Sequence, residues 1–241
     1  MERARRLRYR AAMPTDPRPS ARARLATLAG VAPRLAGALA FRGACYAAMT
    51  ALALANELRA GPVLPDLVLE RLPYLAWVDR ANYVAWLVLY LPIACALLWL
   101  EPARWARYMV TGGLVSLARG ACIVLTTLGP PASPRTRADL VGRDLVAVWL
   151  ELVSPFAIFA RDSLGVWLSQ DLFFSGHAAT TFLLLLYVAH RPRLRALALA
   201  AHVLVVLSVM LAHLHYSIDV VGAWAFTFAL FALREWRPRG P

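Results

Sequence analysis

The chain contains no lysine, and charged residues make up only 17% of its 241 positions. Hydrophobic residues account for 60% and the mean hydropathy is +0.56, which excludes both a soluble domain of this size and a largely disordered chain. Cysteine is scarce as well. The three cysteines, Cys45, Cys95 and Cys122, have no C-x-x-C spacing, which excludes a disulfide scaffold. Because each lies in an apolar run, we expect buried free thiols.

Long apolar stretches occupy most of the chain. A bilayer core about 30 Å thick needs roughly 20 mostly apolar residues per helix. Six stretches of about that size are residues 38–56, 83–100, 108–128, 173–190, 195–214 and 216–234. Charged and proline-containing segments separate them. The sequence therefore predicts an all-α, polytopic membrane protein with six transmembrane helices that sit in a lipid bilayer.

The remaining segments frame these six helices. Residues 1–37 carry nine arginines and two acids, so we interpret them as a basic, flexible cytoplasmic tail without a secretory signal. Residues 38–234 are expected to form the transmembrane domain and residues 235–241 a short basic tail. Residues 145–168 are apolar but interrupted by charges and a proline. There we expect a short interfacial or re-entrant helix between the third and fourth spans rather than a seventh span.

The distribution of arginine orients the helices. Six spans put both termini on one side, where the connecting and terminal segments carry 17 arginines against four acids. The segments on the other side carry seven arginines against nine acids. Because arginine accumulates on the cytoplasmic side, we expect cytoplasmic termini. The net charge of +12 then orients the chain and indicates no nucleic-acid partner. The arginine- and alanine-rich usage suggests a bacterial inner membrane.

Ionisable residues within membrane spans are costly and are functional candidates by default. His177 begins the fourth stretch, and His215 and Asp219 lie where the fifth stretch gives way to the sixth. In the predicted topology all three reach the outer face. On a helix, His215 and Asp219 at i, i+4 would share a side, so the carboxylate could fix the imidazole as a nucleophile or base. A merely structural hydrogen bond is the alternative.

Further residues are suited to a phosphate. Ser175, Gly176 and the backbone amides at the start of the fourth helix would favour an anion. Arg119, in the third stretch, could clamp a phosphate with two hydrogen bonds, or it could pair with a buried acid such as Asp219. A His-x-His pair at the end of the fifth stretch points its rings to different sides of a helix, so we expect no metal site.

With these residues the sequence resembles the sphingomyelin synthase family, a branch of the type 2 phosphatidic acid phosphatase superfamily, over residues 56–230. The family's Cys-Gly-Asp-x-x-x-Ser-Gly-His-Thr motif is matched by Ser-Gln-Asp-x-x-x-Ser-Gly-His-Ala at residues 169–178. Its His-Tyr-Thr-x-Asp-Val motif is matched by His-Tyr-Ser-Ile-Asp-Val at residues 215–220. The arginine of a further motif aligns with Arg119, and a Pro-Leu-Pro-Asp motif is partly present at residues 63–66.

The resemblance implies a mechanism that needs no metal or other cofactor. His215 would attack the headgroup phosphorus of a phospholipid donor, Asp219 would orient His215, and His177 would protonate the departing alcohol. The residues expected at the substrate phosphate are Arg119, Asp171, Ser175, Gly176 and Tyr216. The chain would then be an enzyme whose active site lies at the exoplasmic face.

The resemblance leaves the acceptor and the headgroup open. With a lipid alcohol such as ceramide or a diacylglycerol-like lipid as acceptor, the chain would be a phosphotransferase. With water it would be a lipid phosphate phosphatase or a phospholipase C-like hydrolase. Ala118, Ser169, Gln170 and Ala178 depart from the family pattern around the headgroup and acceptor, not in the triad. A non-catalytic lipid-binding protein with the same fold is a further alternative.

Overall fold

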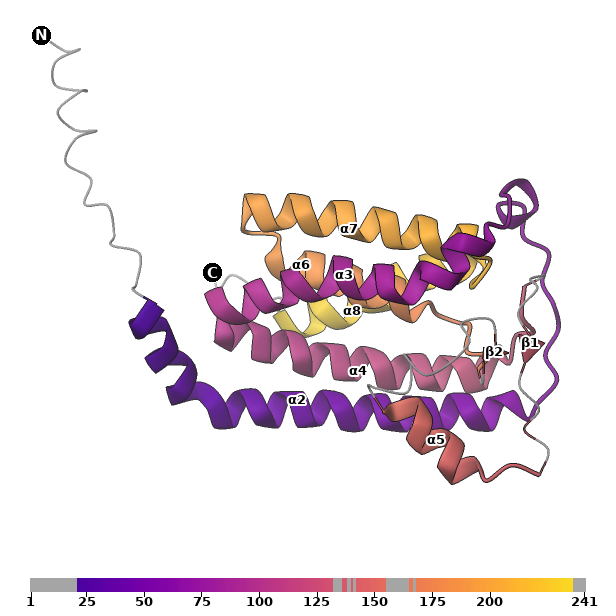
Figure 1. Cartoon of the computed structure of the whole chain (residues 1–241), viewed down its shortest axis with the longest axis horizontal. Coiled ribbons are helices and arrows are strands. Elements are labelled where there is room, and N and C mark those ends of the chain that lie inside the picture. Colours follow the sequence, from indigo (N-terminus) through magenta and orange to yellow (C-terminus); the bar gives the residue numbers. More distant parts are fainter. Residues whose placement is uncertain are drawn as a thin grey trace, which may run out of the picture.

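Six α-helices run along the body of the protein in the computed structural model (Figure 1). They are α2 (Ala21–Glu57), α3 (Ala76–Leu100), α4 (Pro102–Thr126), α6 (Gly176–Val188), α7 (Pro192–Leu211) and α8 (Ser217–Glu235). The structure describes residues 21–131, 136–137, 140, 142–154, 165–166 and 168–235. Successive helices run in opposite directions, so their connections alternate between the two ends of the bundle (Figure 1). The predicted all-α fold is confirmed.

Five helices of the described chain are long and apolar enough to cross a membrane, which confirms a multi-pass membrane protein. The exception is α6, because the predicted span 173–190 contains only the 13 helical residues of α6. A helix of this length rises about 20 Å, less than the bilayer core. The Ser175 hydroxyl caps α6 by accepting a hydrogen bond from the Ala178 amide at 3.4 Å. The helix therefore begins inside its motif, directly after Ser175 and one residue before His177.

Other helix boundaries differ from the predicted spans because the helices extend beyond their most apolar part. Helix α3 begins at Ala76 rather than at residue 83, and α4 begins at Pro102 rather than at residue 108. Proline at the first helical position has no amide hydrogen to leave unpaired, and its backbone angle suits a helix start. Pro192 has the same place in α7. These prolines start the helices directly after the preceding helix ends.

Helix α2 also extends further than predicted, because it begins at Ala21, inside the segment expected to be a flexible tail. Residues 21–37 are rich in alanine, arginine and leucine, which are strong helix formers. The indigo N-terminal part of α2 turns away from the bundle (Figure 1). Pro33 lies inside α2 and removes one backbone hydrogen bond, which accounts for a bend.

A short helix lies between α4 and α6, in the segment where the sequence predicts one. This helix, α5 (Leu145–Val153), is capped by the Asp144 carboxylate, which accepts a hydrogen bond from the Val146 amide at 2.9 Å. It packs on α2, where the Trp149 indole donates to the Ala47 carbonyl at 2.9 Å. Residues 155–164 and 167 of the predicted segment lie outside the described residues. The remaining described elements are η1 (Leu69–Arg71) and the strands β1 (Thr136–Arg137) and β2 (Gly165–Val166), which pair in parallel.

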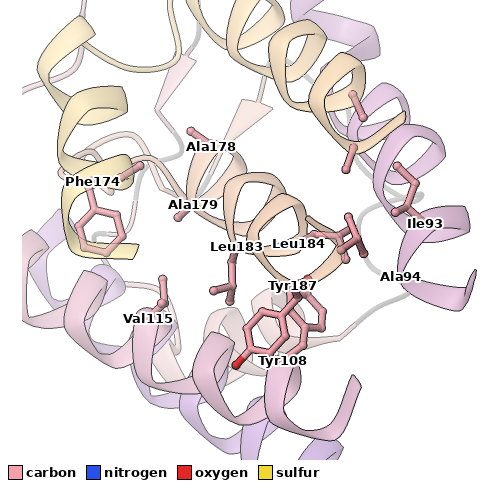
Figure 2. Packing of buried hydrophobic residues seen from close by; sticks show 14 of the residues in the cluster. Ile93, Ala94, Tyr108, Val115, Phe174, Ala178, Ala179, Leu183, Leu184 and Tyr187 are labelled. Carbon is pink, nitrogen blue, oxygen red and sulfur yellow. The ribbon is translucent and has the colours of Figure 1, made fainter. Parts of the chain in front are cut away.

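Helix α6 lies at the centre of the hydrophobic core (Figure 2). Its side chains pack between α3, α4, α7 and α8. The labelled core residues are Ile93, Ala94, Tyr108, Val115, Phe174, Ala178, Ala179, Leu183, Leu184 and Tyr187 (Figure 2). Large apolar side chains such as Leu125 and Leu233, both 82% exposed, cover the outside of the bundle. Such a surface suits lipid rather than water.

The cysteines are free thiols, as predicted, but they are not all buried. Cys45 is buried and Cys122 is partly buried, whereas Cys95 is exposed on the outside of α3. The expectation is wrong for Cys95 because an apolar run in a membrane protein also covers the surface that faces lipid.

Candidate active site

The predicted site residues lie at one end of the bundle, opposite the start of α2 and the end of α8 (Figure 1). His177 is the second residue of α6, and His215 lies just before α8. The Ser175 amide donates a hydrogen bond to the Asp219 carbonyl oxygen at 3.1 Å. This bond ties the start of α6 to the first turn of α8. The two predicted histidines therefore lie near each other in the fold, His177 in the first turn of α6 and His215 just before α8.

His215 precedes α8 instead of lying on it, so the predicted helical i, i+4 geometry is wrong. Helix α8 begins at Ser217, and the Asp219 Oδ2 atom accepts a hydrogen bond from the Tyr216 amide at 2.9 Å. A side chain in the first helical turn that binds the amide just before the helix is half of a capping box. The same Oδ2 atom lies 3.2 Å from Nδ1 of His215. One carboxylate therefore caps the helix and holds the imidazole.

The contact with Asp219 also sets the protonation of His215. An ionised carboxylate can only accept hydrogen bonds, so Nδ1 of His215 carries the ring proton and Nε2 keeps its lone pair. Both side chains are buried, with exposed fractions of 5% for His215 and 0% for Asp219. The second oxygen of Asp219, Oδ1, has no hydrogen-bond partner among the described residues. The arrangement suits a histidine that acts as nucleophile or base through Nε2.

Arg119 is bound by the segment that leads into α6. Its Nε donates to the Phe174 carbonyl at 2.6 Å, and its Nη2 donates to the Asp171 carboxylate at 3.0 Å and to the Asp171 carbonyl. Nη1 lies 3.2 Å from the Met49 sulfur. The sequence left a pairing with Asp219 open, and the acid that Arg119 binds is Asp171. Arg119, which is 6% exposed, thus fixes the segment that carries Ser175 and His177.

Ser175 and Gly176 have structural roles at the start of α6. Ser175 is fully buried, and its hydroxyl caps the helix. A β-carbon at Gly176 would lie 3.3 Å from Arg119 Nε, so glycine allows the guanidinium to approach the helix start closely. Their binding of a substrate phosphate stays a prediction.

Tyr216 is held between two loops. Its hydroxyl accepts a hydrogen bond from the Leu64 amide at 3.1 Å and donates one to the Gly129 carbonyl at 2.9 Å. The side chain is 2% exposed. These bonds use the hydroxyl proton, so a role of Tyr216 at the substrate phosphate, which stays a prediction, would depend on a remaining lone pair.

Trp86 is a neighbour of His177 that the sequence interpretation missed. The two rings meet nearly at right angles, with centroids 5.4 Å apart. Trp86 stacks on Tyr90 of the same helix at 5.1 Å, and the Tyr108 hydroxyl donates to the Tyr90 hydroxyl at 2.8 Å. Aromatic residues spaced along α3 look like ordinary core or lipid-facing residues in the sequence, so only the fold reveals this contact.

His202, also not singled out from the sequence, bridges three helices. The Trp224 indole donates to Nε2 of His202 at 2.8 Å, so Nδ1 carries the proton and lies 2.8 Å from the Thr181 hydroxyl oxygen. Thr181 in turn donates to the His177 carbonyl at 3.0 Å. This chain of bonds supports the first turns of α6. Within the described ranges, no group of three or more potential metal-binding side chains is close enough to hold an ion.

Glu57, the last residue of α2, anchors the other end of the segment that carries Asp171. It is fully buried. Its Oε1 accepts hydrogen bonds from the Ser169 amide at 2.6 Å and from the Gln170 amide, and its Oε2 accepts one from the Ser169 hydroxyl at 3.0 Å. The sequence showed this acid only as a charge at the end of a span. Its partners lie more than one hundred residues away, which no local pattern reveals.

We expect Glu57→Gln to destabilise the protein by about 2–4 kcal/mol, because an amide cannot accept all the hydrogen bonds of a buried carboxylate. The measurement is reversible unfolding in mixed micelles. Glu70→Gln is the matched control, because Glu70 is exposed in the next loop and its removal should change the free energy of unfolding by less than about 0.5 kcal/mol. Equal stability of the two variants would contradict the anchoring role of Glu57.

Comparisons with known proteins agree with the motifs. The family model described as PAP2 superfamily C-terminal matches residues 170–236, which include the starts of α6 and α8. Sphingomyelin synthase-related protein 1 from Mus musculus is 29% identical over 185 residues, covering 73% of this chain and 38% of the relative. The Homo sapiens protein of the same name is also 29% identical over 185 residues, covering 73% of this chain and 44% of the relative. The chain thus spans about two fifths of the length of these curated relatives.

These similarities confirm the predicted resemblance to sphingomyelin synthase-like proteins of the PAP2 superfamily. Both relatives are mammalian, so they give no support to the bacterial source that the residue usage suggested.

Proposed function

We propose that the chain, which is similar to sphingomyelin synthase-like proteins of the PAP2 superfamily, transfers a phospho-headgroup from a phospholipid to a lipid alcohol such as ceramide, through a phosphohistidine. The observation that carries the proposal is the buried His215–Asp219 pair beside the start of α6, where His177 lies. The name sphingomyelin synthase-related protein describes the mammalian relatives and not this chain. For this chain the donor, the acceptor and the chemistry are proposals.

In the first step, Nε2 of His215 attacks the headgroup phosphorus. A phosphorus–nitrogen bond forms as the bond to the diacylglycerol oxygen breaks, and His177 gives its proton to that oxygen. The imidazole of His215 gains positive charge, which the Asp219 carboxylate at 3.2 Å offsets. In the second step His177 removes the proton of the acceptor hydroxyl, whose oxygen attacks phosphorus and releases His215.

The remaining predicted residues would hold the phosphoryl group. Among the described residues Nη1 of Arg119 contacts only the Met49 sulfur, so one of its two hydrogens is available to a phosphate oxygen. Ser175, Gly176, Tyr216 and Asp171 would shape the site around it. No metal or other cofactor takes part in the proposed steps.

The charge distribution supports an exoplasmic site. The end of the bundle where α3 leads into α4 and α6 leads into α7 carries the arginine-rich segments 101–107 and 190–195, whereas the site lies at the opposite end (Figure 1). Arginine-rich segments stay in the cytoplasm. The proposed enzyme therefore works on the outer leaflet, with cytoplasmic termini.

Burial supports a lipid alcohol over water as acceptor. The nucleophile His215 and its partner Asp219 are each no more than 5% exposed, so the atom that would carry the phosphoryl group lies away from bulk solvent, although His177 is only partly buried. A phosphohistidine in such a site is protected from hydrolysis until a lipid hydroxyl enters from the bilayer.

The test is an assay of the whole protein in nanodiscs with phosphatidylcholine, phosphatidylethanolamine or phosphatidylinositol as donor and ceramide as acceptor, in water enriched in oxygen-18. Mass spectrometry should find a phospho-headgroup on ceramide without oxygen-18. A free phospho-headgroup or phosphate carrying oxygen-18 would instead identify a hydrolase. Absence of both products with every donor would contradict the proposal and favour a lipid-binding protein.

A further inference from the structure

Asp219 binds the Tyr216 amide at the start of α8, but among the described residues no side chain of α8 itself accepts a hydrogen bond from the next amide, that of Ser217. The residue before it is Tyr216, whose phenol is engaged elsewhere. The free amide of Ser217 instead donates to Oδ2 of Asp66 at 2.5 Å, across from the loop between α2 and α3. A carboxylate at a helix N-terminus satisfies a free amide and interacts favourably with the helix dipole. Asp66 therefore caps α8 from a distant part of the chain.

The other oxygen of Asp66 fixes the loop in which it lies. Oδ1 accepts hydrogen bonds from the amides of Val68 at 2.9 Å and Leu69 at 3.1 Å. Burial raises the pKa of the Asp66 carboxyl, but the hydrogen bonds from these amides and from Ser217 outweigh it, and the pKa lies below its usual range. Three amides on two oxygens need a group that only accepts, which an ionised carboxylate is and an amide is not.

The loop is joined to the His215 segment on both sides of His215. On one side, the Leu72 carbonyl lies 3.1 Å from Nε2 of His213, and the Leu75 amide donates to the Leu211 carbonyl at 2.9 Å. On the other side are the Tyr216 hydroxyl bond to Leu64 and the Asp66 bond to Ser217. His215 lies outside any helix, so these contacts help to fix its backbone, together with the bonds of the Leu214 amide to Val209 and of the Tyr216 amide to Asp219.

We propose that Asp66 is a positioning residue for His215: by capping Ser217 it fixes the backbone that aims Nε2 of His215 at the substrate. The catalytic consequence rests on the proposed function. Asp66 acts through the Ser217 amide, two residues from His215, and not on the substrate. This gives a physical role to the Leu-Pro-Asp sequence at residues 64–66, which partly matches the Pro-Leu-Pro-Asp motif.

The test compares Asp66→Asn with Glu70→Gln in the full chain in nanodiscs. Both changes remove one negative charge from the same loop, but only the first removes acceptors for α8. Asp66→Asn should lower kcat roughly ten- to hundredfold, because small misplacements of reacting groups are costly, and leave the KM for the donor lipid within about twofold. Glu70→Gln should change neither. Asp66→Ser is the second variant, because a hydroxyl is too short to reach Ser217 and keep the loop bonds.

Hydrogen exchange followed by mass spectrometry supplies a readout that does not depend on activity. In the Asp66 variants, amides of residues 215–219 should exchange roughly tenfold faster, while those of α6 keep their rates. Unchanged exchange at residues 215–219, or faster exchange with unchanged kcat, would overturn the inference. A wild-type protein without phosphoryl transfer would overturn the proposed function, and the exchange rates alone would then decide whether Asp66 holds this segment.

Discussion

Replacing His215 with asparagine should lower phosphoryl transfer by a factor on the order of 10⁴ or more, since it removes the nucleophile of the proposed reaction. Asparagine keeps a donor near the position of Nδ1, so Asp219 retains a partner and the start of α8 keeps its cap. What the variant lacks is Nε2. The measurement is the initial rate of headgroup transfer in nanodiscs at saturating donor.

His190→Asn is the matched control for this prediction. His190 lies at the opposite end of the bundle, where its Nε2 is 2.7 Å from Glu101, and its replacement should leave the rate within about twofold because it touches no part of the site. Transfer in the His215 variant within tenfold of wild type would contradict the role of His215. His177→Ala and Asp219→Ala should also abolish transfer.

Replacing Arg119 with leucine should destabilise the protein by about 3–5 kcal/mol and abolish transfer, because it leaves a buried carbonyl and a carboxylate without their partner. Arg119 is bound to both Phe174 and Asp171, just before the helix that carries His177. Arg119→Lys should not restore activity, since a single ammonium group cannot reproduce the fork that spans both acceptors. Unfolding in mixed micelles and transfer assays measure the two effects.

A double-mutant cycle with Asp171 separates the energy of the Arg119–Asp171 ion pair from that of the other hydrogen bonds of Arg119. Arg119→Leu combined with Asp171→Leu should cost less than the two single changes added together, with a coupling of about 1–3 kcal/mol. Additive losses would contradict the pairing seen between Nη2 and Oδ2.

The fold was largely predictable because hydropathy and charge act over whole helices. Apolar stretches locate the helices, and the alternating directions of these helices place His177 and His215 at one end of the bundle. Helix starts were less predictable. The cap at Ser175 makes α6 begin at Gly176, inside the predicted stretch 173–190. The alanine-rich residues from Ala21 extend α2 into the predicted tail. In both cases local capping and helix propensity set the boundary, and hydropathy does not report them.

The site was predictable in its residue types but not in its geometry. The His215–Asp219 contact was expected from spacing, yet it arises from a capping turn rather than a helix face. The residues that hold the site in place could not be identified from the sequence, because Glu57 and Asp66 bind amides that lie more than one hundred residues away along the chain. Spacing rules describe neighbours within one element, whereas these bonds join separate loops.

The most direct test of the account is to trap the phosphohistidine. The whole protein is incubated with a phospholipid labelled in its headgroup phosphate, without acceptor, and is then digested under alkaline conditions, where phosphohistidine survives. We predict that the label is found on the peptide containing His215, that it is lost in His215→Asn, and that adding ceramide removes it from the wild-type protein. Label on another residue, or transfer to ceramide at full rate with no labelled protein under any condition, would contradict the account.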